Sequence, residues 1–405
     1  MMTPPLPQLG SRNLFPDLQP RVYLAHAAVS PVSTPVRNAV LAVLDDYARL
    51  GVGAFPPWIV QRQRLKEAIG RLIRCDAADL ALVQSTTAGL MALALCIDWR
   101  PGDRVVLTRG EFPANVTPWQ QVAVQFELEI VWLPQPKPHA IEEWLEALQV
   151  ALDGGRVRMV AMSAVQFQTG LQMPLVGPMC HRAGAELCVD AVQAFGAVDI
   201  AVQSAGIDYM ACGAHKWCNG VEGAGFLYVA PHLVTRLRPR MAGWLSHEDG
   251  LGFLFRGAGL LRHDRPIRQS ADFLEIGNLS TASFAGLGAA VEILETLGIP
   301  RIFAHVQAML DQLETGLLAR GFTSLRAPEG SDLRSCTLAV LPPPDIELLL
   351  LHKQLTALGV ATSAPDGYLR LAPHWPNALH EVPVALAAFD AALAAIRSGA
   401  EPRGA

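Results

Sequence analysis

The chain has 405 residues, of which 51% are hydrophobic and 17% charged, a balance that is typical of a compact soluble enzyme and excludes a disordered or fibrous protein. The formal net charge is −5, with 32 basic and 37 acidic residues mixed along the sequence, so we expect no nucleic-acid partner. The length allows two or three domain-sized units and a large buried core.

The seven cysteines are scattered, and none of them makes a CxxC motif or a Cys/His metal spacing. This pattern predicts reduced, mostly buried thiols and no bound metal. The first residues lack a basic region followed by an apolar core, and no uncharged run reaches membrane-spanning length. We therefore expect a cytoplasmic protein with no membrane partner.

The first half of the chain alternates between two kinds of segment. Residues 1–20 are rich in proline and predict an N-terminal extension, while residues 36–50 and 61–74 predict amphipathic helices. Short β-rich runs then alternate with helical stretches, and they lie at 80–84, 104–108, 128–133, 158–164, 186–189, 209–211 and 225–229. This alternation predicts an α/β fold with a mostly parallel sheet wrapped by helices.

The second half follows a stretch rich in glycine and arginine at about 240–270. The expected elements after it are a strand at 336–341 and helices at 281–297, 301–320, 345–358 and 381–397. We therefore predict a large α/β domain over 21–270 and a smaller α+β C-terminal domain over 281–400.

Two segments point to cofactor chemistry. Asp190 ends an apolar run that reads as an interior strand, and Lys216 follows in the sequence Gly213-Ala-His215-Lys216. A buried carboxylate needs a positive partner, such as a protonated pyridine nitrogen, and an amine that condenses with an aldehyde is the other half of pyridoxal phosphate chemistry. The alternative is that Asp190 caps a loop and that the His-Lys pair lies on the surface.

Three further positions could complete a ligand site. Thr86 and Thr87 precede an apolar helix, where hydroxyls and free backbone N–H groups bind anions, although Ser and Thr are also ordinary N-caps. Phe112 follows the run at 104–108 and could stack on a planar ring or be a plain loop aromatic. Arg370, inside an apolar run, suits a substrate carboxylate or a structural ion pair.

Taken together and in this order, these segments resemble the class V aminotransferase family of fold-type I pyridoxal phosphate enzymes, which includes cysteine desulfurases, isopenicillin N epimerases and kynureninases. The resemblance extends from Tyr23 to about Asn377. It rests on the stretch beginning Tyr23-Leu-Ala-His, Thr86-Thr87-Ala-Gly, Glu111-Phe-Pro-Ala-Asn, Asp190-Ala-Val-Gln193 and His215-Lys216.

The resemblance implies a role for each matching residue and a homodimer with shared active sites. Lys216 would form the Schiff base with pyridoxal 5′-phosphate and later move the Cα proton. Asp190 would pair with the pyridinium nitrogen, and Gln193 would bind the ring's phenolic oxygen. The remaining roles are phosphate binding by Thr86, Thr87 and His215, ring stacking by Phe112, contact with the partner subunit's phosphate by Asn278, and binding of the substrate carboxylate by Arg370.

Departures from the family pattern narrow the expected activity. Phe112 replaces the histidine of cysteine desulfurases, and residues 359–370 contain no cysteine to accept sulfur. Gly213 removes one hydroxyl from the expected phosphate site. Gln193 and His215 make kynureninase a poor match. Trp244 and His26 are candidates for the substrate pocket, with plain packing roles as the alternative.

From this pattern we expect an enzyme that acts at the α-carbon of a small-molecule L-amino acid, with aminotransfer as the main expectation. The alternative is an epimerase or a β-eliminating C–S lyase of the same family, which would use the same residues. A hypothesis of another class is a non-catalytic relative that uses the fold for binding. The presence of Lys216, Asp190 and Arg370 together argues against it.

Overall fold

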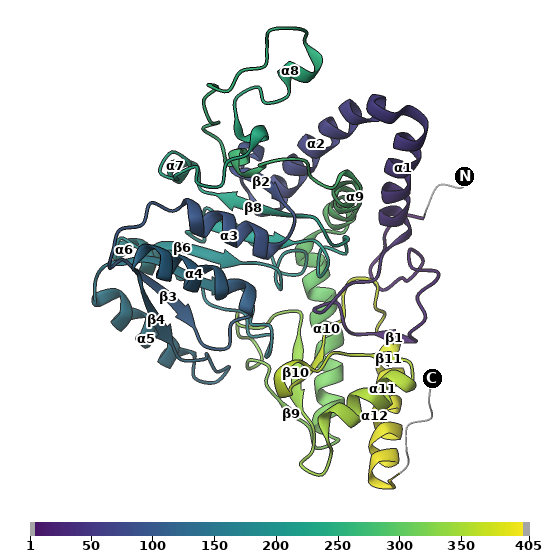
Figure 1. Ribbon diagram of the computed structural model, residues 1–405. Coiled ribbons are helices and arrows are strands. Elements are labelled where there is room, and N and C mark those ends of the chain that lie inside the picture. The colour runs from purple at the N-terminus through teal and green to yellow at the C-terminus, as the bar shows by residue number, and fades with distance from the viewer. Residues whose placement is uncertain (1–4, 400–405) are drawn as a thin grey trace.

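The computed structural model describes residues 5–399. Residues 1–4 and 400–405, at the outer ends of the predicted N-terminal extension and C-terminal domain, lie outside this range. Figure 1 shows a large body built around one sheet and a smaller body below it, which carries the C-terminal helices.

A seven-stranded sheet with the order β2-β8-β7-β6-β5-β3-β4 forms the centre of the large body. Its strands are β2 (Leu80–Val83), β3 (Arg104–Thr108), β4 (Glu129–Leu133), β5 (Val157–Ser163), β6 (Glu186–Asp190), β7 (Tyr209–Gly213) and β8 (Gly225–Val229). Strand β8 runs antiparallel to β7 and β2, and the other neighbours are parallel. The predicted α/β fold with a mostly parallel sheet is confirmed.

Helices flank the sheet, and four of them, α3 to α6, lie in the sequence between successive strands, whereas α8 lies on a loop that projects at the top of the molecule (Figure 1). The helices of the large body are α1 (Thr34–Leu50), α2 (Phe55–Ile73), α3 (Thr86–Cys96), α4 (Thr117–Phe126), α5 (Ile141–Asp153), α6 (Gly177–Arg182), α7 (Pro231–Val234) and α8 (Gly252–Phe255). Strand β6 is buried along its whole length, as expected of an interior parallel strand. Its carboxyl end therefore places Asp190 inside the protein.

Helix α9 (Thr281–Leu297) packs beside α1 and α2. The approach is close because Gly286 has no side chain, and a Cβ atom there would lie 3.1 Å from a methyl group of Val40. The predicted domain boundaries place α9 in the C-terminal domain, whereas the first half of this helix packs on the large body.

The smaller body contains a three-stranded sheet, β12-β10-β9, and a two-stranded sheet of β1 and β11. Its elements are β1 (Val22–Tyr23), β9 (Thr323–Ser324), β10 (Leu338–Leu341), β11 (Val360–Ala361), β12 (Leu369–Leu371), α10 (Ile299–Leu318), α11 (Leu348–Ala357) and α12 (Glu381–Arg397). Val22 pairs with Val360, and Leu14 and Phe15 are buried in the same hydrophobic core. Residues 14–24 thus pack with the C-terminal domain, although the predicted boundaries assign them to the N-terminal extension and the large domain.

Within residues 5–399, no single helix is long and apolar enough to cross a membrane. Helices α9 and α10 meet the length and composition criteria only as a pair, and they are bent by 78° relative to each other. Much of α9 is buried in the protein, as a core helix would be.

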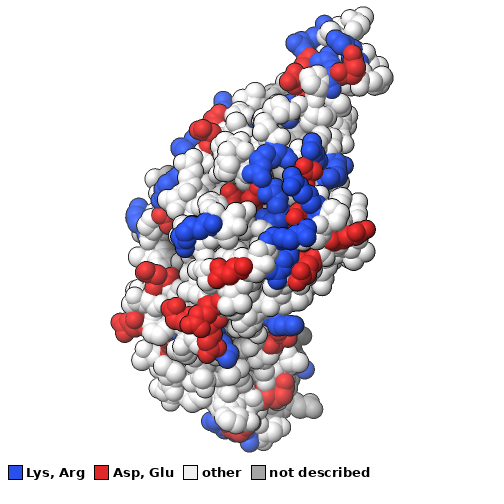
Figure 2. Space-filling view, turned by 90° about the vertical axis from the view of Figure 1, so that its left-hand side faces the viewer, with Lys and Arg blue, Asp and Glu red and all other residues white. Residues whose placement is uncertain are grey.

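Basic side chains gather on the face shown in Figure 2, with acidic side chains among them. One polar pocket of about 460 Å³ is lined by Arg100, Arg158, Arg236 and Arg238 together with acidic residues. Arg158 lies 2.6 Å from Glu186, and Arg238 also has an acidic partner, Asp98. Charges that are far apart in the sequence are therefore partly neutralised where the fold brings them together.

Candidate active site

Lys216 lies in the turn that follows β7, and its position is fixed through the backbone. Ser30 donates its hydroxyl to the carbonyl of Lys216 over 2.6 Å, and its N–H to the carbonyl of His215. The Lys216 Nζ lies 5.4 Å from the centroid of the Phe112 ring. The turn thus holds an amine beside an aromatic face, at the edge of the sheet where ligands of open α/β folds bind.

The environment of Lys216 favours the neutral amine. Burial lowers its pKa to about 8, and Arg370 acts in the same direction, while Asp190 and Cys212 oppose the shift. A partly neutral amine at neutral pH can act as a nucleophile and a base. The chain has three other lysines, Lys66, Lys137 and Lys353, and of these the most buried, Lys66, is paired with Glu275.

Asp190, the last residue of β6, is 1% exposed. Its Oδ1 accepts a hydrogen bond of 2.9 Å from the backbone N–H of Val192. Burial raises the pKa of Asp190 to about 6, although this hydrogen bond and nearby Lys216 favour the carboxylate. A cationic ring nitrogen would further stabilise the charged form, as the expected cofactor role requires.

Gln193 lies on the same buried segment, and its side chain already has two protein partners. Its Nε2 donates to the carbonyl of Ala27, and its Oε1 accepts from Trp217 Nε1, each over 3.0 Å. These bonds fix the amide plane, and the second N–H of Nε2 is left to bind a ligand oxygen. The expected contact with the ring's phenolic oxygen remains a prediction.

The predicted phosphate site gathers at the start of α3. Ser85 caps this helix by accepting a hydrogen bond from the N–H of Ala88. The Thr86 hydroxyl oxygen is buried and has no hydrogen-bond partner within the described chain. A Cβ atom at Gly213 would lie 3.2 Å from this oxygen and 3.4 Å from His215 Nδ1. An unsatisfied hydroxyl beside a helix N-terminus fits a bound phosphate.

Thr87, the other threonine of this predicted site, is exposed on the first turn of the same helix. Phe112 is 43% exposed and packs edge-on against Phe167 with 5.3 Å between the ring centroids. The expected stacking of Phe112 on a planar ring remains a prediction. Both side chains are thus accessible at the carboxyl edge of the sheet.

Arg370, in β12, extends from the smaller body toward the site. It is 4% exposed and donates to the carbonyl of Phe167 over 2.5 Å and to the hydroxyl of Ser363 over 3.1 Å. Burial lowers its pKa to about 10. Since Arg370 forms no ion pair with any acid between residues 5 and 399, this buried cation still lacks a compensating anion, and a substrate carboxylate would provide one.

The other three predicted residues lie in different surroundings. His26 is fully buried, with its Nδ1 3.0 Å from the carbonyl of Ala372 and its ring packed against His374, so it offers no surface to a substrate in this structure. Trp244 is 40% exposed and contacts Phe253. Asn278 is exposed just before α9. The functional roles given to these three residues remain predictions.

Sequence reasoning missed Glu111, which directly precedes Phe112. Its carboxylate accepts hydrogen bonds from the N–H of Ser163 over 2.7 Å and from the Ser163 hydroxyl over 2.5 Å. Ser163 ends β5 and is the register neighbour of Asp190 in β6. The signal in the sequence was an acidic residue three positions after the end of β3, but its partner depends on the pairing of strands.

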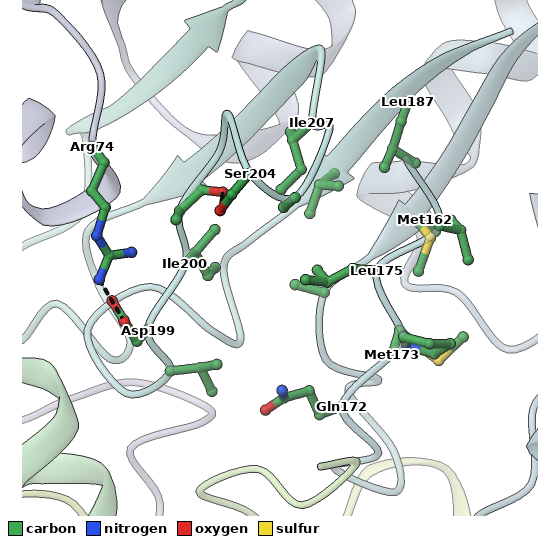
Figure 3. Close-up of a pocket in the computed structure, with 17 residues that line it drawn as sticks. Arg74, Met162, Gln172, Met173, Leu175, Leu187, Asp199, Ile200, Ser204 and Ile207 are labelled. Atoms are coloured by element: carbon green, nitrogen blue, oxygen red, sulfur yellow. Dashed lines mark hydrogen bonds and ion pairs between the residues drawn. The ribbon is translucent and has the colours of Figure 1, made fainter. Parts of the chain in front are cut away.

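A separate cavity of about 450 Å³ lies beside β5 and β6 (Figure 3). It is lined by Met162 and Val189, which are register neighbours one residue before Ser163 and Asp190. Because side chains alternate along a strand, the cavity and the Asp190 carboxylate lie on opposite faces of the sheet. The cavity is therefore distinct from the Lys216 site. Among the described residues, no group of His, Cys, Asp and Glu is arranged to hold a metal ion.

Comparisons with known proteins agree with this geometry. The family model described as Aminotransferase class-V matches residues 22–364. A protein of Methanothermobacter thermautotrophicus named "probable cysteine desulfurase" is 27% identical over 312 residues, which cover 75% of this chain and 74% of that protein. A Bacillus subtilis protein named "uncharacterized aminotransferase YcbU" is 25% identical, with 92% and 94% of the two chains covered.

The fold is also similar to a solved structure of the cystine C-S lyase C-DES in complex with its reaction product cysteine persulfide. The TM-score is 0.81, the identity is 20%, and the match covers 93% of this chain and 98% of that one. At this identity the likeness concerns the fold alone.

Proposed function

We propose that this chain, which belongs to the class V aminotransferase family and whose cofactor is pyridoxal 5′-phosphate, breaks a carbon–sulfur bond in an L-amino acid by β-elimination. The names of the curated relatives support this choice, since the Methanothermobacter protein is called a cysteine desulfurase. The expectation of aminotransfer as the main activity has less support and becomes the second candidate.

The observation that carries the proposal is a site equipped to remove a Cα proton but without a thiol to accept sulfur. Residues 359–370 contain no cysteine. All seven cysteines are free, six are buried, and the partly exposed Cys75 lies just after α2, with a pKa raised to about 12 by burial. A protein persulfide needs a reactive thiolate. We therefore propose that the sulfur leaves with the product instead of passing to the enzyme.

Arg370, Lys216 and Asp190 would each have a separate role in such a reaction. Arg370 would bind the α-carboxylate and orient the Cα–H bond toward Lys216, whose neutral amine takes the proton. Asp190 would keep the ring nitrogen protonated. When bound, pyridoxal phosphate supplies an electron sink for the pair left at Cα. The Cβ–S bond then breaks, and with one water the substrate yields pyruvate, ammonia and the sulfur product, which is hydrogen sulfide from cysteine and cysteine persulfide from cystine.

Aminotransfer is the second candidate because the Bacillus subtilis relative, which is named an aminotransferase, aligns with 92% of this chain. It would use Lys216, Asp190 and Arg370 in the same way up to loss of the proton. The two reactions differ after this step, because aminotransfer releases a keto acid but no ammonia. Epimerisation would instead return the proton to Cα from the other side.

The test is a product analysis with the loaded enzyme and three substrates, L-cystine, L-cysteine and L-alanine. Alanine is the control, because it has a Cα proton but no leaving group at Cβ. We expect pyruvate and ammonia in equal amounts from a sulfur amino acid and neither from alanine. A keto acid formed without ammonia, and only in proportion to an added amino acceptor, would establish aminotransfer instead. Absence of any conversion by the loaded protein would favour the non-catalytic alternative.

A further inference from the structure

Glu111 is a second carboxyl group in the site, and it has no role in the proposed reaction. It follows β3 and reaches across to the end of β5, where Ser163 donates two hydrogen bonds to it. The amide of Asn115 lies 3.4 Å away and is itself fixed by Trp119, whose Nε1 donates to Asn115 Oδ1. This carboxyl is therefore held by several donors.

The strand register places Glu111 next to Asp190. Ser163 and Asp190 are paired residues of adjacent parallel strands, so their side chains share one face of the sheet. The Asp190 charge acts on Glu111 and disfavours its ionisation. Two carboxyl groups thus occupy one buried edge of the sheet, and their charges interact.

The other ionisable groups around this pair are few. Lys216, from the turn after β7, favours the charged form of Asp190. Arg370, from β12, acts on Lys216. Cys188 in β6 and Cys212 in β7 also interact with Asp190, and burial raises the pKa of both thiols so far that they remain uncharged. Glu111 is therefore the nearby acid that can change the charge beside Asp190.

We propose that Glu111 is a positioning residue that gains or loses a proton beside the ionised Asp190 and so sets the negative charge that faces the cationic groups of the site, including the ring nitrogen of the cofactor. The inference rests on the proposed function only for the identity of the partner of Asp190. The Ser163 hydroxyl suits this role because it can donate to the Glu111 carboxylate and accept from the protonated acid. The geometry is thus kept in both states.

The protonation range of Glu111 matches this role. Burial raises its pKa to about 7, although the hydrogen bonds from Ser163 favour the carboxylate. Near neutral pH the group is therefore a mixture of both forms. Ionised Glu111 repels the Asp190 carboxylate and stabilises cations in the site, whereas protonated Glu111 does neither.

The first test uses Glu111→Gln, which keeps the shape of the side chain and an acceptor and a donor for Ser163. Its control is Glu381→Gln, because Glu381 is also a buried carboxyl, with Asn377 2.7 Å away, but lies in α12 of the smaller body. In full-length protein without cofactor, infrared spectra of ¹³C-glutamate-labelled samples follow ionisation of Glu111, whose band is identified by its loss in Glu111→Gln. We expect the Glu111 midpoint to fall by about one pH unit in Asp190→Asn, which lacks the neighbouring charge, and to stay unchanged in Glu381→Gln.

The second test loads the same variants with pyridoxal phosphate and titrates the visible absorbance of the bound cofactor with pH. Its midpoint should also move to lower pH in Glu111→Gln, because a negative charge that stabilised the cationic form is missing. A purely structural Glu111 would show the same Glu111 midpoint with and without the Asp190 charge and would leave the cofactor midpoint unchanged in Glu111→Gln, and this result would overturn the inference. If the wild-type protein bound no cofactor, the proposed function would fail, while the infrared titration would still decide the role of Glu111.

Discussion

At the scale of single residues, the lowered pKa of Lys216 predicts how the protein takes up its cofactor. Only the neutral amine attacks an aldehyde, so the uptake rate should rise with pH through a midpoint near 8, the pKa that burial gives Lys216. Stopped-flow absorbance measured at a series of pH values after mixing with pyridoxal phosphate checks this expectation. A rate still rising steeply near pH 10 would show that Lys216 has the pKa of an exposed lysine.

Arg370 carries a second prediction at this scale. Arg370→Lys keeps the charge but loses the planar fork, so the KM for the amino acid should rise about 10- to 100-fold while kcat falls less. The control is Arg326→Lys, because Arg326 is equally buried but is paired with Asp311 and Glu314. This control should lower thermal stability and leave KM unchanged. Equal KM values for wild type and Arg370→Lys would contradict the carboxylate role.

At the scale of elements, the start of α3 predicts a selective effect on cofactor affinity. Thr86→Val removes a buried hydroxyl that has no partner among the described residues, so stability should hardly change. The Kd for pyridoxal phosphate should rise about tenfold, as expected for the loss of one hydrogen bond to a charged group.

Thr108→Val provides the matched control for this prediction. The Thr108 hydroxyl accepts a hydrogen bond of 3.2 Å from Trp144 Nε1, so its loss leaves a buried donor unsatisfied. The control should lower the melting temperature with no change in Kd, the opposite pattern to Thr86→Val. Calorimetric melting and fluorescence titration measure the two quantities. Unaltered cofactor affinity in Thr86→Val would remove Thr86 from the phosphate site.

The elements themselves also explain which parts of the structure were predictable. Strand β3 and helix α9 have the predicted bounds because apolar runs between turn residues determine them locally. Strand β1 has only two residues and forms by pairing with β11, more than 300 positions away, so no local pattern marks it as part of the smaller body. The Glu111–Ser163 contact depends on strand register in the same way. The motifs located Asp190 and Lys216, but only the fold brings Glu111 to Asp190.

At the scale of the whole molecule, we propose a homodimer formed through α1 and α2. Both helices expose large apolar side chains, among them Leu41, Leu44 and Val60, at 39%, 56% and 52% of their accessible surface. Such a patch is typical of an interface. Asn278 is exposed as well, as its expected contact with the phosphate of a partner subunit would require.

Leu44→Asp should therefore dissociate the dimer, whereas Val150→Asp, at a 72% exposed position of α5, should not. Sedimentation velocity distinguishes the two states by mass. If the site is shared between subunits, the monomeric variant should also bind pyridoxal phosphate more weakly. Wild-type protein that sediments at the mass of one chain at every concentration would refute the dimer.

The central claim is that Lys216 holds pyridoxal phosphate, and borohydride reduction followed by peptide mass spectrometry tests it most directly. With only Lys66, Lys137, Lys216 and Lys353 in the chain, the site of attachment can be assigned without ambiguity. The structure predicts a phosphopyridoxyl group on the peptide that contains Lys216 and none on the other three lysines. A label on another lysine, or no label on loaded and reduced protein, would contradict the account.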